Sequence, residues 1–324
     1  MTGQAGKIVT VFGGSGFLGR HVVRALANEG YRIRVAVRRP DLAGFLQPLG
    51  TVGQIMPIQA NLRDPASVAH AIEGSDAVVN LVGILYETGK ATFDGQHHLG
   101  AKVIAEETAK AGIDRMVQIS AIGADINSPS AYASSKAKGE QAVLSALPDA
   151  IIVRPSLLFG PEDDFFNKFA SMAKLSPFLP LVGGGDTQFQ PAFVGDVAQV
   201  IALGVKGDLD AGATYELGGP EIKSFKQLLA MTLDEIHRKR PLLPLPFWMA
   251  STMGWFFEKL PMKPALTRDQ VTLLKSDNVV SEQASLEHRT FEGIGITPLA
   301  IEAVIPSYLW SYRPGGQYEA NRRA

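Results

Sequence analysis

The 324-residue chain contains no cysteine, and this absence excludes several kinds of chemistry at once. Disulfides, thiolate nucleophiles, iron–sulfur clusters and cysteine-based zinc sites all need a sulfur that the chain lacks. An excess of one charge is also missing, because 31 basic residues face 32 acidic ones and the net charge is -1. Such a chain has no global field to attract nucleic acid or an acidic membrane, so we expect no nucleic-acid partner.

The sequence also lacks an apolar run long enough to cross a membrane. The longest stretch of interest, residues 241–257, is shorter than the roughly 20 apolar residues required and contains Pro241, Pro244 and Pro246. An apolar strand pattern begins already at Lys7, which predicts that no signal or transit peptide is present. We therefore expect a protein that does not span a bilayer.

What the first half of the chain does contain is an alternation of short apolar runs with longer segments of helical period. This alternation is typical of βαβ units around a parallel sheet, and the continuous apolar runs fit strands covered on both faces. Strands are predicted at residues 8–12, 33–37, 55–59, 77–81, 116–120 and 151–153. Helices are predicted at residues 16–29, 67–73, 94–111 and 131–146. The pattern predicts an α/β protein with a doubly wound parallel sheet of the Rossmann type.

Glycines follow the first predicted strand at a G-x-x-G-x-x-G spacing, as Gly13, Gly16 and Gly19. Because strand, turn and helix adjoin there, the backbone can approach a pyrophosphate with no side chain between them. The helix N-terminus then offers unpaired N–H groups and the positive end of its dipole. The turn predicts a dinucleotide site formed by Gly13, Ser15, Gly16, Phe17, Leu18 and Gly19.

Two arginines, Arg38 and Arg39, end the second predicted strand, where NAD-specific sites place an acid about 20 residues beyond the glycines. Two guanidinium groups suit a ribose 2′-phosphate, because each can pair with phosphate oxygens in bidentate fashion. This interpretation predicts NADPH (NADP) as the cofactor. An ordinary pair of solvated surface arginines is the alternative.

After Arg154 glycine- and proline-rich segments interrupt shorter helical patterns, which indicates a second domain. We expect residues 1–160 to form the NAD(P)-binding Rossmann domain and residues 161–324 a smaller mixed α/β domain for a substrate or a partner. The sheet is expected to receive a further strand near residues 214–217.

Motifs in the first 200 residues are those by which the chain resembles the extended short-chain dehydrogenase/reductases. They are the glycine turn, Asn61-Leu62-Arg63-Asp64, Tyr132-Ala133-Ser134-Ser135-Lys136, and Arg154-Pro155 leading to Phe159-Gly160-Pro161. The resemblance implies that Asn61 and Leu62 flank the adenine, and that the segment after Arg154-Pro155 closes over the nicotinamide. The further cofactor-binding residues that it implies are Leu81, Val82 and Gly83 on the ribose side, with Ser120, Tyr132, Lys136, Pro155 and Leu158.

Longer strings of sequence carry a narrower likeness, to the dehydrogenase-like accessory subunits of respiratory complex I (NADH:ubiquinone oxidoreductase). The strings are residues 11–20, 60–63, 80–85, 119–125, 159–163, 183–185, 190–194 and 308–310. This resemblance implies a peripheral subunit that holds NADPH tightly, lies off the electron-transport path and has other complex I subunits as partners. A chain without a presequence suits the cytoplasmic face of a bacterial inner membrane, or the matrix face if it is mitochondrial.

Tyr132 and Lys136 lie one turn apart on a predicted helix. In active members of the family such a pair passes a proton, because the ammonium lowers the phenol pKa. Family strands commonly end in Ser-Ser with a hydroxyl facing the substrate, whereas this chain has Ser120-Ala121-Ile122, and losing such a donor typically costs on the order of 10²–10³ in rate. We interpret the pair as vestigial cofactor anchors and expect no independent catalysis. The alternative is an NADPH-dependent short-chain reductase or epimerase acting on a small quinone- or sugar-like substrate.

Two polar clusters are interpreted as structural. His97 and His98 are adjacent, so on a helix they face about 100° apart and cannot converge on one metal ion. We expect a partly exposed helix face there and no metal site. Glu162-Asp163-Asp164 follows Gly160-Pro161, and we expect it to cap a helix N-terminus.

Aromatic and methionine side chains crowd residues 247–257. One interpretation is a buried helix that roofs a substrate cleft. The other is an interfacial helix, on a membrane surface or against a membrane-bound partner, because its tryptophans are followed by Lys259 and Lys263.

Overall fold

The computed structural model describes residues 6–259 and 264–316, so Lys263 lies outside the described residues. The chain divides into two compact units. The first comprises the residues up to Pro155 together with Val194–Leu217 and Glu282–Gly295. The second comprises Ser156–Phe193, Gly218–Ser281 and the residues from Ile296 onward.

The first unit is built on a seven-stranded sheet in which every pairing is parallel. Its strands are β1 (Ile8–Phe12), β2 (Arg32–Val37), β3 (Ile55–Gln59), β4 (Ala77–Asn80), β5 (Met116–Ile119), β6 (Ile151–Pro155) and β11 (Thr214–Leu217). They are ordered β11-β6-β5-β4-β1-β2-β3, so the direction of winding reverses between β1 and β4. The predicted doubly wound sheet is confirmed, and its reversal point is where sheets of this kind bind ligands.

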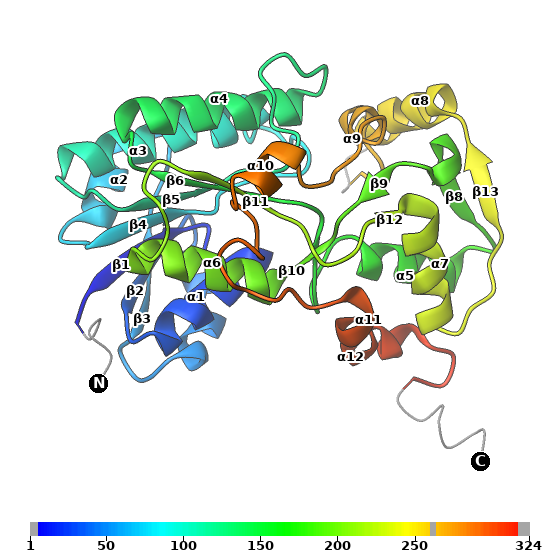
Figure 1. Ribbon diagram of the computed structural model, residues 1–324, viewed down its shortest axis with the longest axis horizontal. Coiled ribbons are helices and arrows are strands. Elements are labelled where there is room, and N and C mark those ends of the chain that lie inside the picture. The colour runs from blue at the N-terminus through cyan, green and yellow to red at the C-terminus, as the bar shows by residue number, and fades with distance from the viewer. Residues whose placement is uncertain (1–5, 260–263, 317–324) are drawn as a thin grey trace. The chain divides into compact units, whose positions relative to one another are not determined.

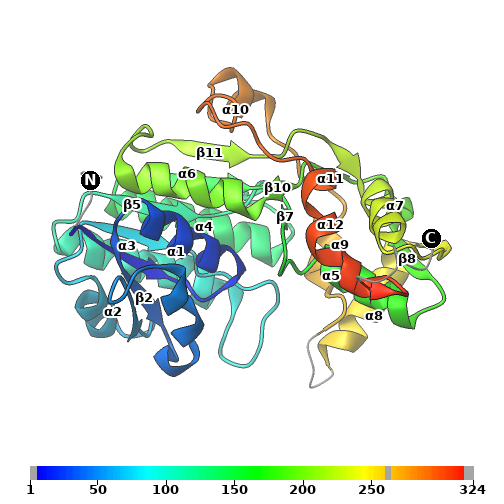
Figure 2. The same cartoon turned by 90° about the horizontal axis from the view of Figure 1, so that it is seen from below.

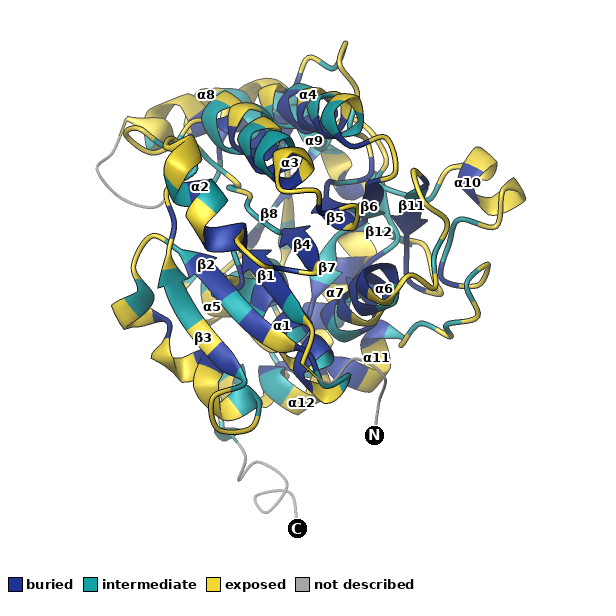
Figure 3. Ribbon diagram, turned by 90° about the vertical axis from the view of Figure 1, so that its left-hand side faces the viewer, coloured by how far each residue is buried: buried dark blue, intermediate teal, exposed yellow. Residues whose placement is uncertain are grey.

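Helices cover both faces of this sheet (Figures 1 and 2). One face carries α1 (Phe17–Asn28) and α6 (Val194–Lys206), and the other carries α2 (Pro65–Ile72), α3 (Gly100–Lys110) and α4 (Ala131–Ala146). The central strands β1 and β4 are buried, whereas edge strand β3 is partly exposed (Figure 3). The helix predicted over residues 94–111 is divided into a π-helix at Asp94–Leu99 followed by α3.

The boundary expected at residue 160 differs from the division of the structure. The first unit ends at Pro155 and then regains residues 194–217 and 282–295. Strand β11 pairs with β6, and α6 packs against α1, so these later residues complete the sheet of the first unit and one of its helical faces. The strand expected near residues 214–217 is present as β11, but a single boundary cannot describe a chain that leaves the first unit and returns to it.

The second unit contains short strand pairs and helices. β7 (Leu158–Phe159) pairs with β10 (Ala192–Phe193), β8 (Leu179–Val182) with β13 (Leu242–Leu245), and β9 (Gln188–Phe189) with β12 (Lys223–Ser224). Its helices are α5 (Phe166–Leu175), α7 (Phe225–Glu235), α8 (Phe247–Glu258), α9 (Arg268–Leu273), α11 (Ile301–Val304) and α12 (Pro306–Leu309), while α10 (Glu282–Leu286) belongs to the first unit. Phenylalanine rings in edge-to-face contact pack together with aliphatic side chains in its core.

Helix α8 is the aromatic segment singled out in the sequence. Only Ala250 and Gly254 are buried on it, whereas Trp248 is 71% exposed and Trp255 is 51% exposed. The interpretation of α8 as a buried helix is therefore wrong. Within the described residues no helix combines the length and the apolar character that a membrane crossing requires.

Candidate nucleotide-binding site

The glycine turn lies at the reversal point of the sheet. Gly13 follows β1 with φ +76°, and a Cβ on it would lie 3.0 Å from the carbonyl carbon of Leu81 and 3.1 Å from the nitrogen of Val82. Leu81 in turn donates its N–H to the Phe12 carbonyl at 2.9 Å. The structure thus brings the predicted phosphate turn directly against the predicted ribose-side segment.

The remaining turn residues open the N-terminus of α1. A Cβ on Gly19 would lie 2.4 Å from the Gly13 carbonyl oxygen, so only glycine lets the helix begin this close to the turn. Gly16 is the N-cap residue, and no side chain caps this helix, whereas Asp64 caps α2 and Ser130 caps α4. The N-terminus of α1 thus leaves room for a phosphate to bond its first-turn N–H groups, which lie on Phe17, Leu18 and Gly19 after Ser15 and Gly16.

The two arginines after β2 differ in their surroundings. Arg39 donates to the Asp41 carboxylate from Nε at 3.0 Å and from Nη2 at 2.7 Å, with its side chain 67% exposed. Hydrogen bonding to this carboxylate raises the pKa of Arg39 and lowers the pKa of Asp41. Arg38 is exposed and forms no ion pair with any residue that the structure describes. Arg38 is therefore the better placed of the two to receive a phosphate.

The predicted adenine-side residues follow β3. The Asn61 side-chain oxygen accepts the Arg63 N–H at 3.2 Å, and the Asn61 N–H donates to Ser67 Oγ at 3.1 Å, so this exposed asparagine shapes a turn. Leu62 is half-buried and packs against Gly100, where a Cβ would lie 3.0 Å from Leu62 Cδ1. Part of the Leu62 side chain therefore packs against α3.

The ribose-side segment after β4 is held by a residue that sequence reasoning missed. Asn80 is fully buried, and its Oδ1 accepts the Val82 N–H at 3.0 Å while its Nδ2 donates to Gln118 Oε1 at 2.8 Å. Two amide side chains buried at the ends of neighbouring strands are a signal that a sequence can show. They fix the path of Leu81, Val82 and the exposed Gly83.

Tyr132 and Lys136 begin α4, as predicted, and Lys136 is only 5% exposed. Its Nζ lies 5.8 Å from the centroid of the Tyr132 ring, and a Cβ on Gly83 would lie 3.3 Å from the same Nζ. Burial lowers the pKa of Lys136 to about 8, and the charge of Glu140 opposes this change. A ribose hydroxyl would supply the hydrogen bonds that such a buried ammonium needs.

Ser120 follows β5, and its hydroxyl is buried with no hydrogen-bond partner among the residues that the structure describes. A buried hydroxyl rarely lacks a partner, so this atom fits a site completed by a ligand. The next residues, Ala121 and Ile122, carry no hydroxyl, and Ile122 donates its N–H to the Pro155 carbonyl at 3.0 Å. Leu158, the last predicted cofactor residue, lies in β7 of the second unit.

His97 corrects one prediction. It is 1% exposed, not part of an open helix face, because it lies on the side of its helix that packs against α4. Its imidazole bonds Ile84 and Ser135, while His98 remains half-buried and pairs with Asp94 at 2.9 Å. Within the described parts of the chain, no group of three or more histidine or acidic residues is placed to hold a metal.

The acidic cluster of the second unit is structural in one of its members. Asp163 is buried, and its carboxylate accepts the N–H groups of Gly160, Phe165 and Asn167, the last of these in the first turn of α5. The expected cap is therefore present at Asp163.

Comparison with known proteins agrees with this geometry. Residues 9–218 match the model of the NAD dependent epimerase/dehydratase family. The chain is 36% identical over 323 residues to NADH dehydrogenase (ubiquinone) 1 alpha subcomplex subunit 9, mitochondrial, of Arabidopsis thaliana, covering 96% of this chain and 79% of that protein. It is 32% identical to the NADH-ubiquinone oxidoreductase 40 kDa subunit, mitochondrial, of Neurospora crassa, covering 97% and 82%.

Among solved structures, the chain resembles a dTDP-glucose 4,6-dehydratase from Streptomyces venezuelae with NAD and TYD bound. The TM-score is 0.70 at 20% identity, and the match covers 97% of this chain and 99% of that chain. At this identity the likeness is one of fold.

Proposed function

Since the chain belongs to the NAD dependent epimerase/dehydratase family, and within it to the group of complex I subunits named above, we propose that it is a nucleotide-holding accessory subunit of respiratory complex I. The observation that carries the proposal is the extent of the likeness: 36% identity runs over 96% of the chain and so includes both compact units. A similarity confined to the dinucleotide-binding fold would support nucleotide binding but not a role as a complex I subunit.

The ligand proposed for the site is NADPH. When it is bound, this group can supply a hydride, but we propose that here it serves as a fixed part of the structure. The uncapped N-terminus of α1 would receive its phosphates, Arg38 its 2′-phosphate, and Lys136 with Tyr132 and Ser120 its nicotinamide-side ribose. These assignments are supported by the glycine contacts and by the unpartnered hydroxyl of Ser120.

The absence of independent catalysis is proposed from the end of β5. Ala121 and Ile122 offer no hydroxyl at the position where an active relative holds a substrate carbonyl. Tyr132 and Lys136 can then serve as ribose anchors without passing a proton. Attachment to the complex is proposed to be peripheral, at the cytoplasmic face of a bacterial membrane or the matrix face of a mitochondrial one, with the exposed aromatic side chains of α8 facing a partner or the membrane surface.

The test is native separation of gently solubilised membranes from cells that express the tagged chain. We expect it to migrate with NADH:ubiquinone oxidoreductase activity and to carry close to one NADPH per chain that stays reduced through many turnovers. The Tyr132→Phe variant removes one proposed ribose anchor and should weaken NADPH binding, but complexes that retain the nucleotide should respire at the parental rate. A free soluble protein that oxidises NADPH with a carbonyl substrate would replace the proposal by the reductase alternative.

A further inference from the structure

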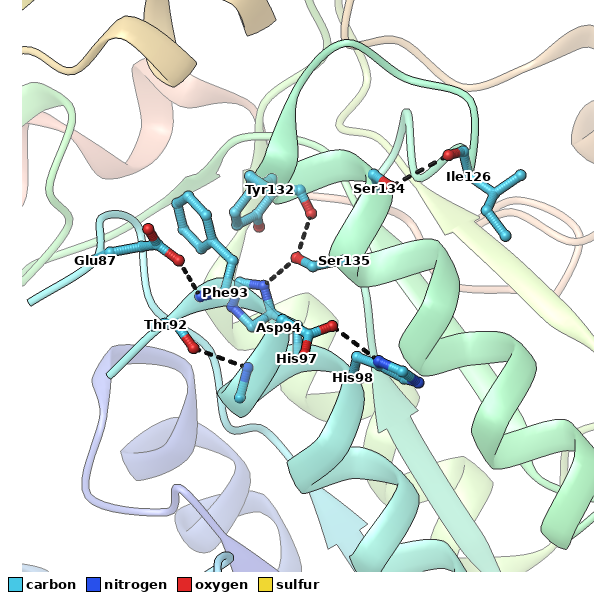
Figure 4. A network of polar contacts seen from close by, with 11 residues as sticks. Glu87, Thr92, Phe93, Asp94, His97, His98, Ile126, Tyr132, Ser134 and Ser135 are labelled. Carbon is cyan, nitrogen blue, oxygen red and sulfur yellow. Dashed lines mark hydrogen bonds and ion pairs between the residues drawn. The ribbon is translucent and has the colours of Figure 1, made fainter. Parts of the chain in front are cut away.

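His97 lies at the centre of a buried cluster between the π-helix at Asp94–Leu99 and the start of α4 (Figure 4). Its ring stacks on Phe93, with centroids 5.5 Å apart and planes at 28°, and meets the Tyr132 ring edge-on at 5.3 Å. The backbones also approach closely, because a Cβ on Gly139 of α4 would lie 2.1 Å from the His97 carbonyl oxygen. His97 is therefore enclosed by both elements.

The hydrogen bonds of the imidazole run in one direction. Nε2 lies 3.0 Å from the Ile84 nitrogen and accepts its N–H, so Nε2 carries no proton. The ring proton is then on Nδ1, which donates to Ser135 Oγ at 2.9 Å. The Ser135 hydroxyl in turn donates to the Tyr132 carbonyl at 2.8 Å. The chain of bonds starts at a loop amide and ends on the backbone of α4.

The two ends of this chain belong to the two sides of the nucleotide site. Ile84 closes the segment after β4, whose earlier part is fixed by the bond from Val82 to Asn80. Ser135 directly precedes Lys136 on α4. A Cβ on Gly83 would lie 3.3 Å from Lys136 Nζ and 3.6 Å from His97 Nε2, so loop, imidazole and ammonium converge.

We propose that His97 is a positioning residue of the nucleotide site: its two ring nitrogens fasten the Leu81–Ile84 segment to the helix that carries Tyr132 and Lys136. His97 acts through Ile84 and Ser135, without touching the ligand itself. The inference rests on the nucleotide-binding function proposed above and adds the residue that aligns the two halves of the site.

The imidazole stays uncharged over the physiological range. Burial and, to a lesser extent, the nearby Lys136 ammonium together lower the pKa of His97 to about 2, although acceptance of the Ile84 N–H opposes this change. Lys136 and Tyr132 of α4 are the titratable side chains that face the ring. Since a protonated ring cannot accept the Ile84 N–H, the uncharged form is the one that keeps the loop in place.

The test compares three variants of the full-length protein, with two measurements on each. In His97→Gln the side-chain amide oxygen can replace Nε2 as the acceptor of the Ile84 N–H. The shorter side chain of His97→Asn reaches only toward Ser135, and His97→Leu can form neither hydrogen bond. The first measurement is hydrogen exchange of the Ile84 amide in nucleotide-free protein, and the second is the Kd for NADPH by fluorescence titration. His98→Leu is the matched control, because His98 is the neighbouring residue and, among the described residues, its side chain bonds only Asp94.

We expect His97→Leu to speed Ile84 exchange and to raise the Kd for NADPH about tenfold, as the loss of one or two net hydrogen bonds predicts. His97→Gln should restore most of the Ile84 protection and of the NADPH affinity, and His97→Asn should restore less of each. His98→Leu should match the parent protein in both measurements. The ¹⁵N spectrum of the parent should show an Nδ1–H tautomer that does not titrate between about pH 5 and pH 8.

Two results overturn the proposal: Ile84 exchange that is equal in His97→Gln and His97→Asn, or an Nε2–H tautomer in the parent protein. The comparison of Gln with Asn holds even if the leucine variant does not fold. A parent protein that binds no NADPH would refute the proposed nucleotide site, whereas the exchange of Ile84 would still decide the role of His97.

Discussion

The Tyr308 hydroxyl donates a hydrogen bond of 2.6 Å to the Asp163 carboxylate, across 145 residues of chain. Burial is the largest influence on both groups and raises the pKa of the Asp163 carboxyl and of the Tyr308 phenol. The bond ties α12 to the cap at the N-terminus of α5, so two distant segments of the second unit are joined at one buried carboxylate.

Replacing Tyr308 with Phe should lower the free energy of unfolding by about 1–3 kcal/mol, because a buried charged acceptor loses one of its donors. Urea unfolding monitored on the second unit measures the loss. Tyr312→Phe is the matched control, since its hydroxyl donates at 3.1 Å to the neutral side chain of Asn167 and should cost less. Equal losses in the two variants would contradict a special role for Asp163.

Lys136→Met should stabilise the nucleotide-free protein at neutral pH while weakening its hold on the nucleotide. A pKa lowered from 10.5 to about 8 corresponds to a cost of about 3 kcal/mol for keeping the buried ammonium charged. The folded protein releases this proton more readily than the unfolded chain, so parental stability rises as the pH increases from about 8 to 10.5.

Urea unfolding of the parent and Lys136→Met, each below pH 8 and near pH 10.5, should show the advantage of the variant shrinking at the higher pH. Added NADPH should reverse the order, because a ribose hydroxyl would accept a hydrogen bond from the buried ammonium. Lys138→Met, at an exposed position of α4, serves as the control. If the difference in unfolding free energy between the two proteins does not depend on pH, the buried charge of Lys136 is not its cause.

Arg38→Asp should reduce the preference for NADPH over NADH by about 10- to 100-fold, the range expected for losing hydrogen bonds to a charged phosphate. Arg39→Asp should do less, since the Arg39 guanidinium is already engaged by Asp41. Titrations with both nucleotides give the ratio of Kd values. Full NADPH preference in Arg38→Asp would remove the basis for assigning a 2′-phosphate site.

The sheet could be predicted from the sequence because each buried strand is a continuous apolar run and each covering helix has its own period. Residues 8–12 and 55–59 form strands with the predicted ends. The π-helix at Asp94–Leu99 could not be predicted, because its local sequence does not distinguish it from the α-helix that it joins. The strand near residues 214–217 is also indicated by the sequence, whereas the return of α10 to the first unit depends on contacts between distant residues, which no local pattern encodes.

The same limit applies to the site. The glycine turn, Tyr132 and Lys136 were predictable because their spacing is set within one strand–turn–helix unit. The prediction for His97 is wrong because it assigns both histidines to one face, whereas adjacent helical residues point in different directions: His97 lies on the buried side with Phe93 and Ala101, and His98 lies on the partly exposed side. Exposure of Trp248 was undecided, since an apolar helix looks the same in sequence whether it meets the core or a partner.

Gly19→Ala should abolish nucleotide retention. Its added methyl group would lie 2.4 Å from the Gly13 carbonyl oxygen and 2.6 Å from Gly14, so the turn and α1 must separate. Gly44→Ala is the control, because no atom lies within 4 Å of the added group. Nucleotide content after gel filtration should fall to background in the first variant only, and retention by Gly19→Ala would argue against phosphate binding at this turn.

The exposed aromatic face of α8 predicts that Trp248→Ser with Trp255→Ser weakens attachment to the complex or the membrane while leaving the fold intact. The helix packs through its small residues: a Cβ on Gly254 would lie 2.8 Å from the Arg268 nitrogen, and Ala250 is fully buried. The two tryptophans are exposed, so replacing them should leave the packing of the core unchanged.

Co-migration with complex I on native gels should fall in the double variant, while the unfolding temperature of the isolated protein stays the same. Leu175→Ser, at a position 85% exposed on α5, is the control for losing an exposed apolar side chain elsewhere. If the double variant instead unfolds the isolated protein and Leu175→Ser does not, the tryptophans stabilise the second unit and the partner surface must be sought on another face.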